Sequence, residues 1–175
     1  INIKANNSSC EDTINFIKAS GYVNNISIQN SFSDAFDADF SNLKIENLEI
    51  TSAINDCTDF SAGVYELVNL KLSKCGDKAV SIGEKSNVKI KEINVSEADI
   101  GLAAKDSSIL SLKNGYLSNL RTCVSAYNKK QEFNGGLVII DNIKCNKFSN
   151  KFESDKLSKI IITQDLKISK KWNEF

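Results

Sequence analysis

The chain has 175 residues, enough for one domain with a sizeable core and short for two. Acidic and basic residues balance at 22 each, and Arg121 is the single arginine, so we expect neither nucleic acid nor an anionic membrane surface as a partner. No apolar run approaches the roughly 18 residues of a membrane span, which argues against membrane insertion.

The first predicted element is a strand at residues 1–4, where the letters INIK alternate between apolar and polar side chains. Because the chain starts directly on this strand and contains no methionine, we expect it to be part of a longer parent chain. Residues 9–20 have a composition compatible with a helix, but a 22-residue repeat includes them as its first, degenerate rung.

This repeat aligns four columns of residues with distinct character. A small-residue column contains Thr13, Ala35, Cys57, Ala79, Gly101 and Cys123. Two mostly apolar columns contain Ile14, Phe36, Thr58, Val80, Leu102 and Val124, and then Phe16, Ala38, Phe60, Ile82, Ala104 and Ala126. The polar or small column between them contains Asn15, Asp37, Asp59, Ser81, Ala103 and Ser125. The alternation predicts one short strand per rung with one buried face.

A second strand follows in each rung, at ISI from Ile26, LEI from Leu48, LKL from Leu70, INV from Ile93 and YLS from Tyr116. Asn25, Asn47 and Asn69 precede three of these strands, and we expect them to stack and hydrogen-bond from rung to rung. Helical spacing and the leucine-rich-repeat signature are both missing. The chain is therefore predicted to be all-β, as a right-handed parallel β-helix of about six rungs of 22 residues.

We expect residues 1–175 to form a single β-helix domain, with regular rungs at 10–145 and a distorted last rung plus a cap at 146–175. Trp172 is predicted to cover the end of the core there. The N-terminal end has no evident cap, so a partner or a second subunit is expected to cover it.

Five stretches carry a resemblance to a known family: SDAFDADFS at 33–41, NDCTDFSAG at 55–63, GDKAVSIGEKS at 76–86, IGLAAKDSS at 100–108 and AYNKKQEF at 126–133. They resemble bacterial right-handed parallel β-helix repeat proteins of the pectate-lyase-like superfamily. The resemblance implies the fold and a secreted or cell-envelope location. It does not select an activity, because the superfamily contains lyases, hydrolases, epimerases, tailspikes and adhesins.

Stacking brings the polar column onto one outer face, so Asp37 and Asp59 are expected one rung apart, with Asp39 two residues along the strand. Carboxylates this close must raise a pKa, recruit a cation or pair with lysine. The second option predicts a Ca²⁺ site at Asp37, Asp39 and Asp59, since Ca²⁺ prefers carboxylate oxygens. Lyases of the resembling superfamily use Ca²⁺ to neutralise a uronate.

Basic residues lie in the rungs beyond these aspartates. Lys105 and Arg121 are predicted to act with Asp37 and Asp59 in catalysis, as a base or as a clamp for a substrate carboxylate. Lys78, Tyr127 and Lys129 are predicted substrate-binding residues, with Tyr127 as an aromatic that stacks on a sugar.

An alternative chemistry is glycosidic hydrolysis by the paired aspartates, which needs an acid and a base about 5 to 10 Å apart. The complete absence of histidine removes serine or cysteine nucleophiles that depend on histidine, and most zinc sites. A purely structural interpretation also exists, because aspartate, serine and lysine commonly form the turns and soluble faces of such folds. The five cysteines are interpreted mostly as small packing residues, with Cys123 and Cys145 as possible neighbours.

The predicted function is a carbohydrate-active β-helix that binds or processes an acidic polysaccharide, either as a Ca²⁺-assisted lyase or as a glycoside hydrolase. The alternatives are a non-catalytic module that binds a glycan or a partner, and a structural spacer in a larger envelope or secreted protein. Measurements of turnover separate the first from the other two.

Overall fold

The computed structural model describes residues 1–163. Its strands are β1 (Asn2–Ser8), β2 (Asp12–Ile17), β3 (Ser20–Ser31), β4 (Asp34–Asp39), β5 (Asn42–Ala53), β6 (Thr58–Ser61), β7 (Val64–Gly83), β8 (Asn87–Lys105), β9 (Ile109–Tyr127), β10 (Leu137–Ser154) and β11 (Lys159–Ile162). The helix-compatible stretch at 9–20 contains strand β2, as the repeat predicts.

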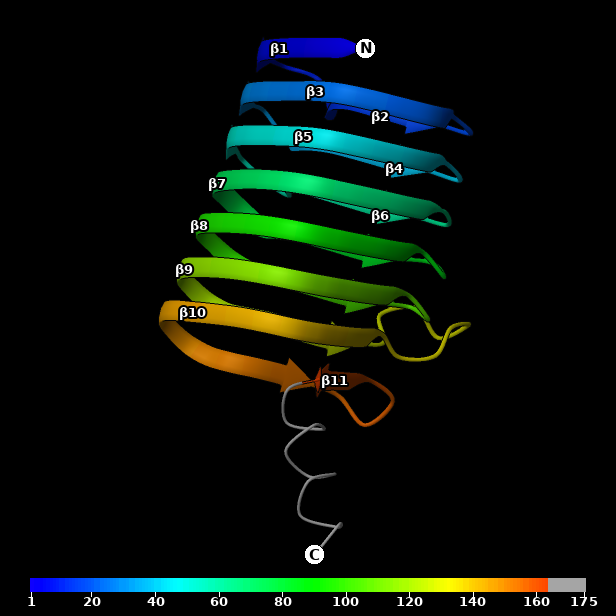
Figure 1. Cartoon of the computed structure of the whole chain (residues 1–175), viewed down its shortest axis with the longest axis vertical. Helices are drawn as coiled ribbons and strands as arrows, with labels where there is room; N and C mark the ends of the chain where they lie inside the picture. The colour runs from blue at the N-terminus through cyan, green and yellow to red at the C-terminus, as the bar shows by residue number, and fades with distance from the viewer. Residues whose placement is uncertain (164–175) are drawn as a thin grey trace, which may run out of the picture.

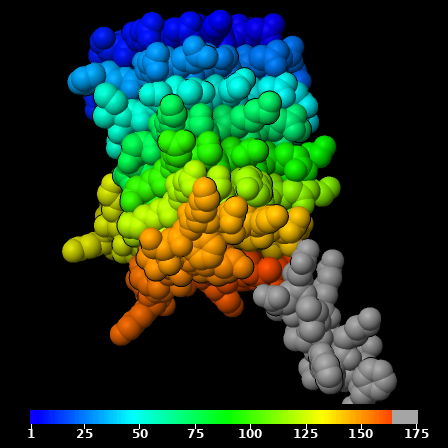
Figure 2. Space-filling model, turned by 90° about the vertical axis from the view of Figure 1, so that its left-hand side faces the viewer, coloured from blue at the N-terminus to red at the C-terminus, as the bar shows by residue number. Residues whose placement is uncertain are grey.

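All strand pairs are parallel and join neighbouring rungs, so the predicted parallel β-helix is confirmed, with about seven turns of about 22 residues. One path of pairing runs β1-β3-β5-β7-β8-β9-β10-β11, and β2, β4 and β6 form a second path that joins β7. Figure 1 shows the first path as a stack of broad bands with β2, β4 and β6 behind it. In the space-filling view the chain colours form successive layers, because each rung packs on its neighbours (Figure 2).

Each rung bends twice, which divides its outer surface into three faces. In β5 the first face runs from Asn42 to Ile45 and the second from Asn47 to Ala53. The third face consists of β2, β4, β6 and the C-terminal ends of β7 to β10. Single residues in the left-handed region make the bend after the second face, such as Asn30 with φ 57° and Ser52 with φ 67°.

The interior is filled by the apolar columns that the repeat defines. Phe36 and Phe60 are fully buried, their ring centroids are 5.6 Å apart, and the Tyr65 ring lies 4.8 Å from that of Phe60. The Tyr65 hydroxyl donates to the Ala38 carbonyl oxygen at 2.8 Å, which satisfies the one polar atom of this aromatic stack.

The period departs from 22 residues in several places, the first between β1 and β3, where Asn2 pairs with Asn25 at a spacing of 23. Between β7 and β8, Val80 pairs with Leu102 at the usual spacing of 22, but Asn69 pairs with Glu92 at a spacing of 23. The extra residue lies in the turn at Glu84 and Lys85, both of which have positive φ. Between β9 and β10 the spacing grows to 28 residues, because the loop at 128–136 is inserted there.

The predicted end of the regular rungs at residue 145 differs from the observed pairing. β10 continues to pair with β9 as far as Ser154, and β11 begins one more rung by pairing Lys159 with Leu137. The remainder of the predicted cap, including Trp172, lies outside the described residues.

The interpretation of most cysteines as packing residues is wrong. Disulfides join Cys57 to Cys75 and Cys123 to Cys145, and Cys10 is a free, exposed thiol. The second bridge does not follow the 22-residue column, because the longer loop places Cys145 opposite Leu117 in the pairing. Both bridges therefore run between neighbouring rungs through the interior.

We predict that Phe60→Ala lowers the free energy of unfolding by about 3–5 kcal/mol, because it removes a fully buried ring from between Phe36 and Tyr65. Urea denaturation followed by circular dichroism measures the change. Phe32→Ala is the control, since Phe32 is exposed and its removal should change stability by less than about 0.5 kcal/mol. A loss below about 1 kcal/mol for the Phe60 variant would contradict this account of the core.

Candidate functional site: the carboxylate face

The polar column of the repeat lies on the outer surface of the third face. Its residues are register partners in the order Asn15, Asp37, Asp59, Ser81, Ala103 and Ser125. Asp37 on β4 and Asp59 on β6 therefore stand on adjacent strands, about 4.8 Å apart along the solenoid axis. We call this surface, with Asp12, Asp39 and Glu84 at its edges, the carboxylate face.

Asp37 has no basic partner within ion-pair distance in the described structure. Its Oδ2 accepts a hydrogen bond of 3.2 Å from the Asn15 amide, which also donates to Asp12. Burial, followed by the charges of Asp39, Asp12 and Asp59, raises the pKa of Asp37 to about 7. Asp37 therefore holds a proton to much higher pH than an ordinary aspartate.

Asp39 lies beside Asp37 on the same strand, and its pKa is raised by burial and by the charge of Glu84. Glu84 itself accepts a hydrogen bond from Ser61 at 2.5 Å and forms an ion pair with Lys130 from the inserted loop. Burial opposes these contacts, but together they hold the pKa of Glu84 below its ordinary value. Glu84 is therefore an ionised side chain at the edge of the face.

Lys105 reaches Asp59 across an intervening rung. Its Nζ lies 3.7 Å from Asp59 Oδ2, and its Cε passes 3.5 Å from the place where a side chain at Gly83 would begin. Lys105 is only 6% exposed, so its ammonium group needs a compensating anion. Burial raises the pKa of Asp59, and Lys105 is the largest opposing influence.

Three polar atoms around this pair are buried without a hydrogen-bond partner in the described structure: Asp59 Oδ1, Ser81 Oγ and Asp106 Oδ2. Buried polar atoms are normally satisfied, and leaving one unmet costs free energy. Asp59 and Ser81 belong to the outward column, one and two rungs from Asp37.

Asp34 and Asp56 have a structural role in the turn before the third face. Asp34 Oδ1 accepts the backbone N–H of Asp56 at 2.9 Å, and Asp56 Oδ1 accepts the backbone N–H of Lys78 at 2.8 Å. Each side chain thus ties one rung to the next, which is the turn-forming use of aspartate. Burial raises the pKa of Asp56 to about 6, and the charge of Lys78 opposes that rise.

Lys78, a predicted substrate-binding residue, is engaged within the chain. Its Nζ lies 3.5 Å from Asp56 Oδ1 and contacts Asp77. Burial lowers the pKa of Lys78, but the hydrogen bond to Asp77 and the charge of Asp56 keep it above its ordinary value. Lys78 is therefore a charged partner of the turn aspartates.

Arg121, a predicted catalytic residue, lies on β9, three strands beyond β6 in the stack. Its guanidinium group donates to both carboxylate oxygens of Asp99, at 2.8 and 2.9 Å, and lies 3.7 Å from Glu153. The structure does not bring Arg121 together with Asp37 and Asp59.

Tyr127 is the register partner of Lys105 and is half-buried at the C-terminal end of the face. Burial raises the pKa of Tyr127, and the charge of Lys78 opposes that effect. Lys129 starts the inserted loop, where its backbone N–H donates to Asp106 Oδ1 at 2.7 Å while its side chain is exposed. Tyr127 therefore borders the face, and Lys129 lies on its rim.

The Ca²⁺ site predicted at Asp37, Asp39 and Asp59 receives no geometric support. Within residues 1–163, no three Asp, Glu or Cys side chains are arranged so that they would hold a metal ion. The prediction of a Ca²⁺ requirement is left to experiment, where a chelator tests it directly.

Sequence reasoning missed Gly83, Glu84 and Lys130. Gly83 lies 22 residues before Lys105, so the repeat places the two residues in one column on adjacent rungs. Because Gly83 has no side chain, it leaves room for the Lys105 side chain to pass over it. Lys130 was hidden because its loop folds back to a turn two rungs earlier. No sequence pattern predicts the contact between Lys130 and Glu84.

Comparisons with protein-family models, with curated proteins and with solved structures give no significant match. In residues 1–163 no helix is long and apolar enough to cross a membrane. The site is therefore interpreted from its own geometry.

We predict that Asp37 makes the protein less stable as the pH rises. Its pKa is about 7 when folded and near 3.8 when unfolded, so the folded state binds the extra proton between these values. The contribution of Asp37 to the free energy of unfolding should fall as the pH rises from about 4 to about 7 and then level off.

Urea denaturation of the natural chain and of Asp37→Asn at pH 5 and pH 8 tests this. Relative to the natural chain, the variant should gain on the order of 1–2 kcal/mol between pH 5 and pH 8, after allowance for solvent screening. The control is Glu66→Gln on the exposed first face, which should show no such gain. An equal pH dependence of Asp37→Asn and the natural chain would refute the raised pKa.

Proposed function

We propose that the carboxylate face binds a polysaccharide and hydrolyses its glycosidic bonds. The observation that carries this proposal is the adjacency of Asp37 and Asp59 in different electrostatic settings. Asp37 is half-buried among like charges and retains its proton, whereas Asp59 faces the buried ammonium group of Lys105. Glycosidases rely on such a pair, one carboxylic acid and one carboxylate.

In this proposal Asp37 is the general acid that protonates the leaving glycosidic oxygen, and Asp59 is the carboxylate that attacks or stabilises the anomeric carbon. Lys105 is a positioning residue whose ammonium group opposes the burial that raises the pKa of Asp59. A separation of one rung, about 4.8 Å, is close to the shorter spacing of glycosidases that retain anomeric configuration. Asp37 then takes the proton of the incoming water in the second step.

The charges of the face favour hydrolysis over the lyase reaction. A lyase that acts on uronates needs a cation or a free basic group at the substrate carboxylate. Lys78, Lys105 and Arg121 are all paired with carboxylates of the chain, and Lys129, whose side chain is exposed, lies on the rim of the face. Asp12, Asp37, Asp39 and Glu84 would repel an acidic polymer. We therefore propose a neutral polysaccharide as the substrate at this face, in place of the acidic one expected from the sequence.

The proposal is compatible with a protein that works outside the cytosol. Disulfides persist in oxidising compartments, and two are present. A secreted or envelope-associated location is part of the proposal on this ground.

Asp37→Asn and Asp59→Asn should each lower the rate of hydrolysis by about 10²- to 10⁴-fold while the variants remain folded, because each removes a group that transfers a proton or carries charge in the transition state. Glu66→Gln should retain full activity. The assay follows new reducing ends from neutral and uronate-containing polysaccharides, and the absorbance of unsaturated uronates, with Ca²⁺ or with chelator.

Reducing ends that appear with chelator present and require Asp37 would support the proposal. Absorbance that requires Ca²⁺ would establish a lyase instead. No product from any substrate, by a folded protein, would refute hydrolysis and leave a non-catalytic module or a structural spacer.

A further inference from the structure

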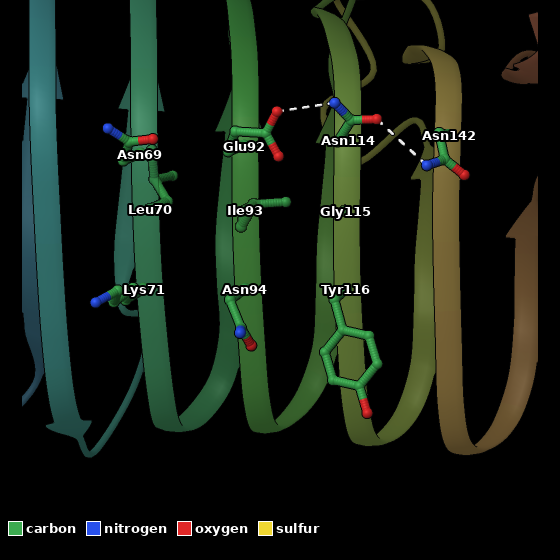
Figure 3. Close-up of a pocket in the computed structure, with 10 residues that line it drawn as sticks. All are labelled: Asn69, Leu70, Lys71, Glu92, Ile93, Asn94, Asn114, Gly115, Tyr116 and Asn142. Atoms are coloured by element: carbon green, nitrogen blue, oxygen red, sulfur yellow. Dashed lines mark hydrogen bonds between the residues drawn. The ribbon is translucent and has the colours of Figure 1, made fainter.

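A separate groove runs along the first bend of the solenoid, on the surface where the asparagines stack. One wall is the asparagine ladder itself, and the opposite wall is the next outward row of side chains on the second face, which includes Lys71, Asn94 and Tyr116 (Figure 3). Leu70, Ile93 and Gly115 lie between the two rows, and because the Leu70 and Ile93 side chains point into the core, the backbone of these residues forms the floor.

The groove is longer than one cavity. A hollow of about 370 Å³ extends from Asn69 to Asn142, and a second of about 260 Å³ extends from Asn25 to Lys71. The two share Asn69 and Lys71, so they are successive parts of one groove that follows the solenoid axis across several rungs. A groove with this direction suits an extended, linear ligand.

The asparagine ladder predicted from the sequence is confirmed and is longer than predicted. Each side chain donates from Nδ2 to the residue one rung earlier: Asn25 to Asn2 at 2.6 Å, Asn47 to Asn25 at 2.9 Å, Asn69 to Asn47 at 3.1 Å, Asn114 to Glu92 at 2.8 Å, and Asn142 to Asn114 at 3.3 Å. Glu92 occupies a position in the ladder that is otherwise asparagine.

Glu92 interrupts the ladder because a carboxylate has no hydrogen to donate. It accepts from Asn114 through one oxygen, and nothing in residues 1–163 donates to its other oxygen or to Asn69 Oδ1. Figure 3 shows the Asn69 oxygen directed toward Glu92 with no bond between them. Asn69 Oδ1 and the second Glu92 oxygen, which Figure 3 shows on the side toward Asn114, are therefore two acceptors along the ladder that have no donor in residues 1–163.

Tyr116 lies on the strand that follows Glu92, two residues along from Asn114, and is 40% exposed. The sequence alignment placed Tyr116 in the inward position of its strand, which is wrong. Gly115 is the partner of Ile93, and Tyr116 pairs with Asn94 and points outward. Its ring carries an exposed surface beside the floor of the groove, and Lys144 Nζ lies 5.9 Å from its centroid.

We propose that this groove binds a neutral linear polysaccharide, with sugar hydroxyl groups donating to Asn69 Oδ1 and Glu92 and a sugar ring stacking on Tyr116. Sugars combine many hydroxyl donors with apolar ring faces, and the groove offers acceptors and an exposed aromatic ring. The rung spacing of about 4.8 Å is comparable to the length of one unit in an extended glycan, so successive units meet successive rungs.

Other ligand classes fit this groove less well. A peptide cannot extend the sheet here, because the strands that line the groove are paired on both sides. A metal ion or an amine would be repelled by Lys71 and Lys144, and a phosphate would be repelled by Glu49 and Glu92. A neutral ligand rich in hydroxyl groups avoids both conflicts.

The inference does not rest on hydrolysis at the carboxylate face, since it concerns the first bend and the second face. The test therefore uses the full chain carrying Asp37→Asn, which prevents turnover if the carboxylate face is catalytic. Isothermal titration measures binding of soluble hexasaccharides of β-linked glucose, mannose, xylose and N-acetylglucosamine.

Two substitutions are decisive. Glu92→Asn supplies an amide that donates to Asn69, completes the ladder and fills the gap, so the variant should remain folded and lose at least 10-fold in affinity. Tyr116→Ala should lose a similar factor through the missing ring. The matched control is Tyr22→Ala, because Tyr22 is an exposed aromatic residue at another position.

Binding by the parent chain that falls with Glu92→Asn and Tyr116→Ala, and persists with Tyr22→Ala, would support the inference. No binding of any hexasaccharide, or binding unchanged by Glu92→Asn, would overturn it. Neither binding result decides whether the natural chain hydrolyses a polysaccharide, because hydrolysis is tested separately through Asp37 and Asp59.

Discussion

Parallel pairing of each rung with the next is the constraint on which this structure depends. Backbone hydrogen bonds fix neighbouring strands about 4.8 Å apart, so residues that are 22 apart in the sequence become neighbours in space. This spacing places Phe36 beside Phe60 in the core and aligns Asp37 with Asp59 on the outer surface. It also brings Asn47 and Asn69 within hydrogen-bond distance. Core, ladder and carboxylate face are three results of one repeated register.

The sequence predicted much of this because period and register coincide over most of the chain. The fold, the inward columns, the outward position of Asp37 and Asp59 and the asparagine ladder all follow from the alignment. Errors arise where the register shifts. The extra residue near Glu84 shifts β8 by one position, and carrying that shift on into β9, where the spacing returns to 22, misplaced Tyr116. The loop at 128–136 places Cys145 opposite Leu117, although its disulfide with Cys123 makes these two cysteines the neighbours that the sequence suggested.

Side chains that span more than one rung could not be predicted from columns. Lys105 crosses the position of Gly83 to reach Asp59, and Lys130 reaches Glu84 from two rungs away. These contacts depend on side-chain length and on the path of a loop, and neither has a periodic signal. These contacts also determine the charge distribution of the carboxylate face, because Lys105 pairs with Asp59 and Lys130 pairs with Glu84.

The two disulfides have a mechanical consequence. A solenoid pulled from its ends unravels one rung at a time, because each rung contacts only its neighbours. Peeling from the N-terminus can proceed as far as Cys57, and peeling from the C-terminus as far as Cys145, where a covalent link holds the next rung. The central rungs, which carry Lys105 and the gap at Glu92, lie between the two links. Under tension the segments closed by the two links, 57–75 and 123–145, cannot be drawn out, so the unravelled chain stays shorter than its number of residues implies.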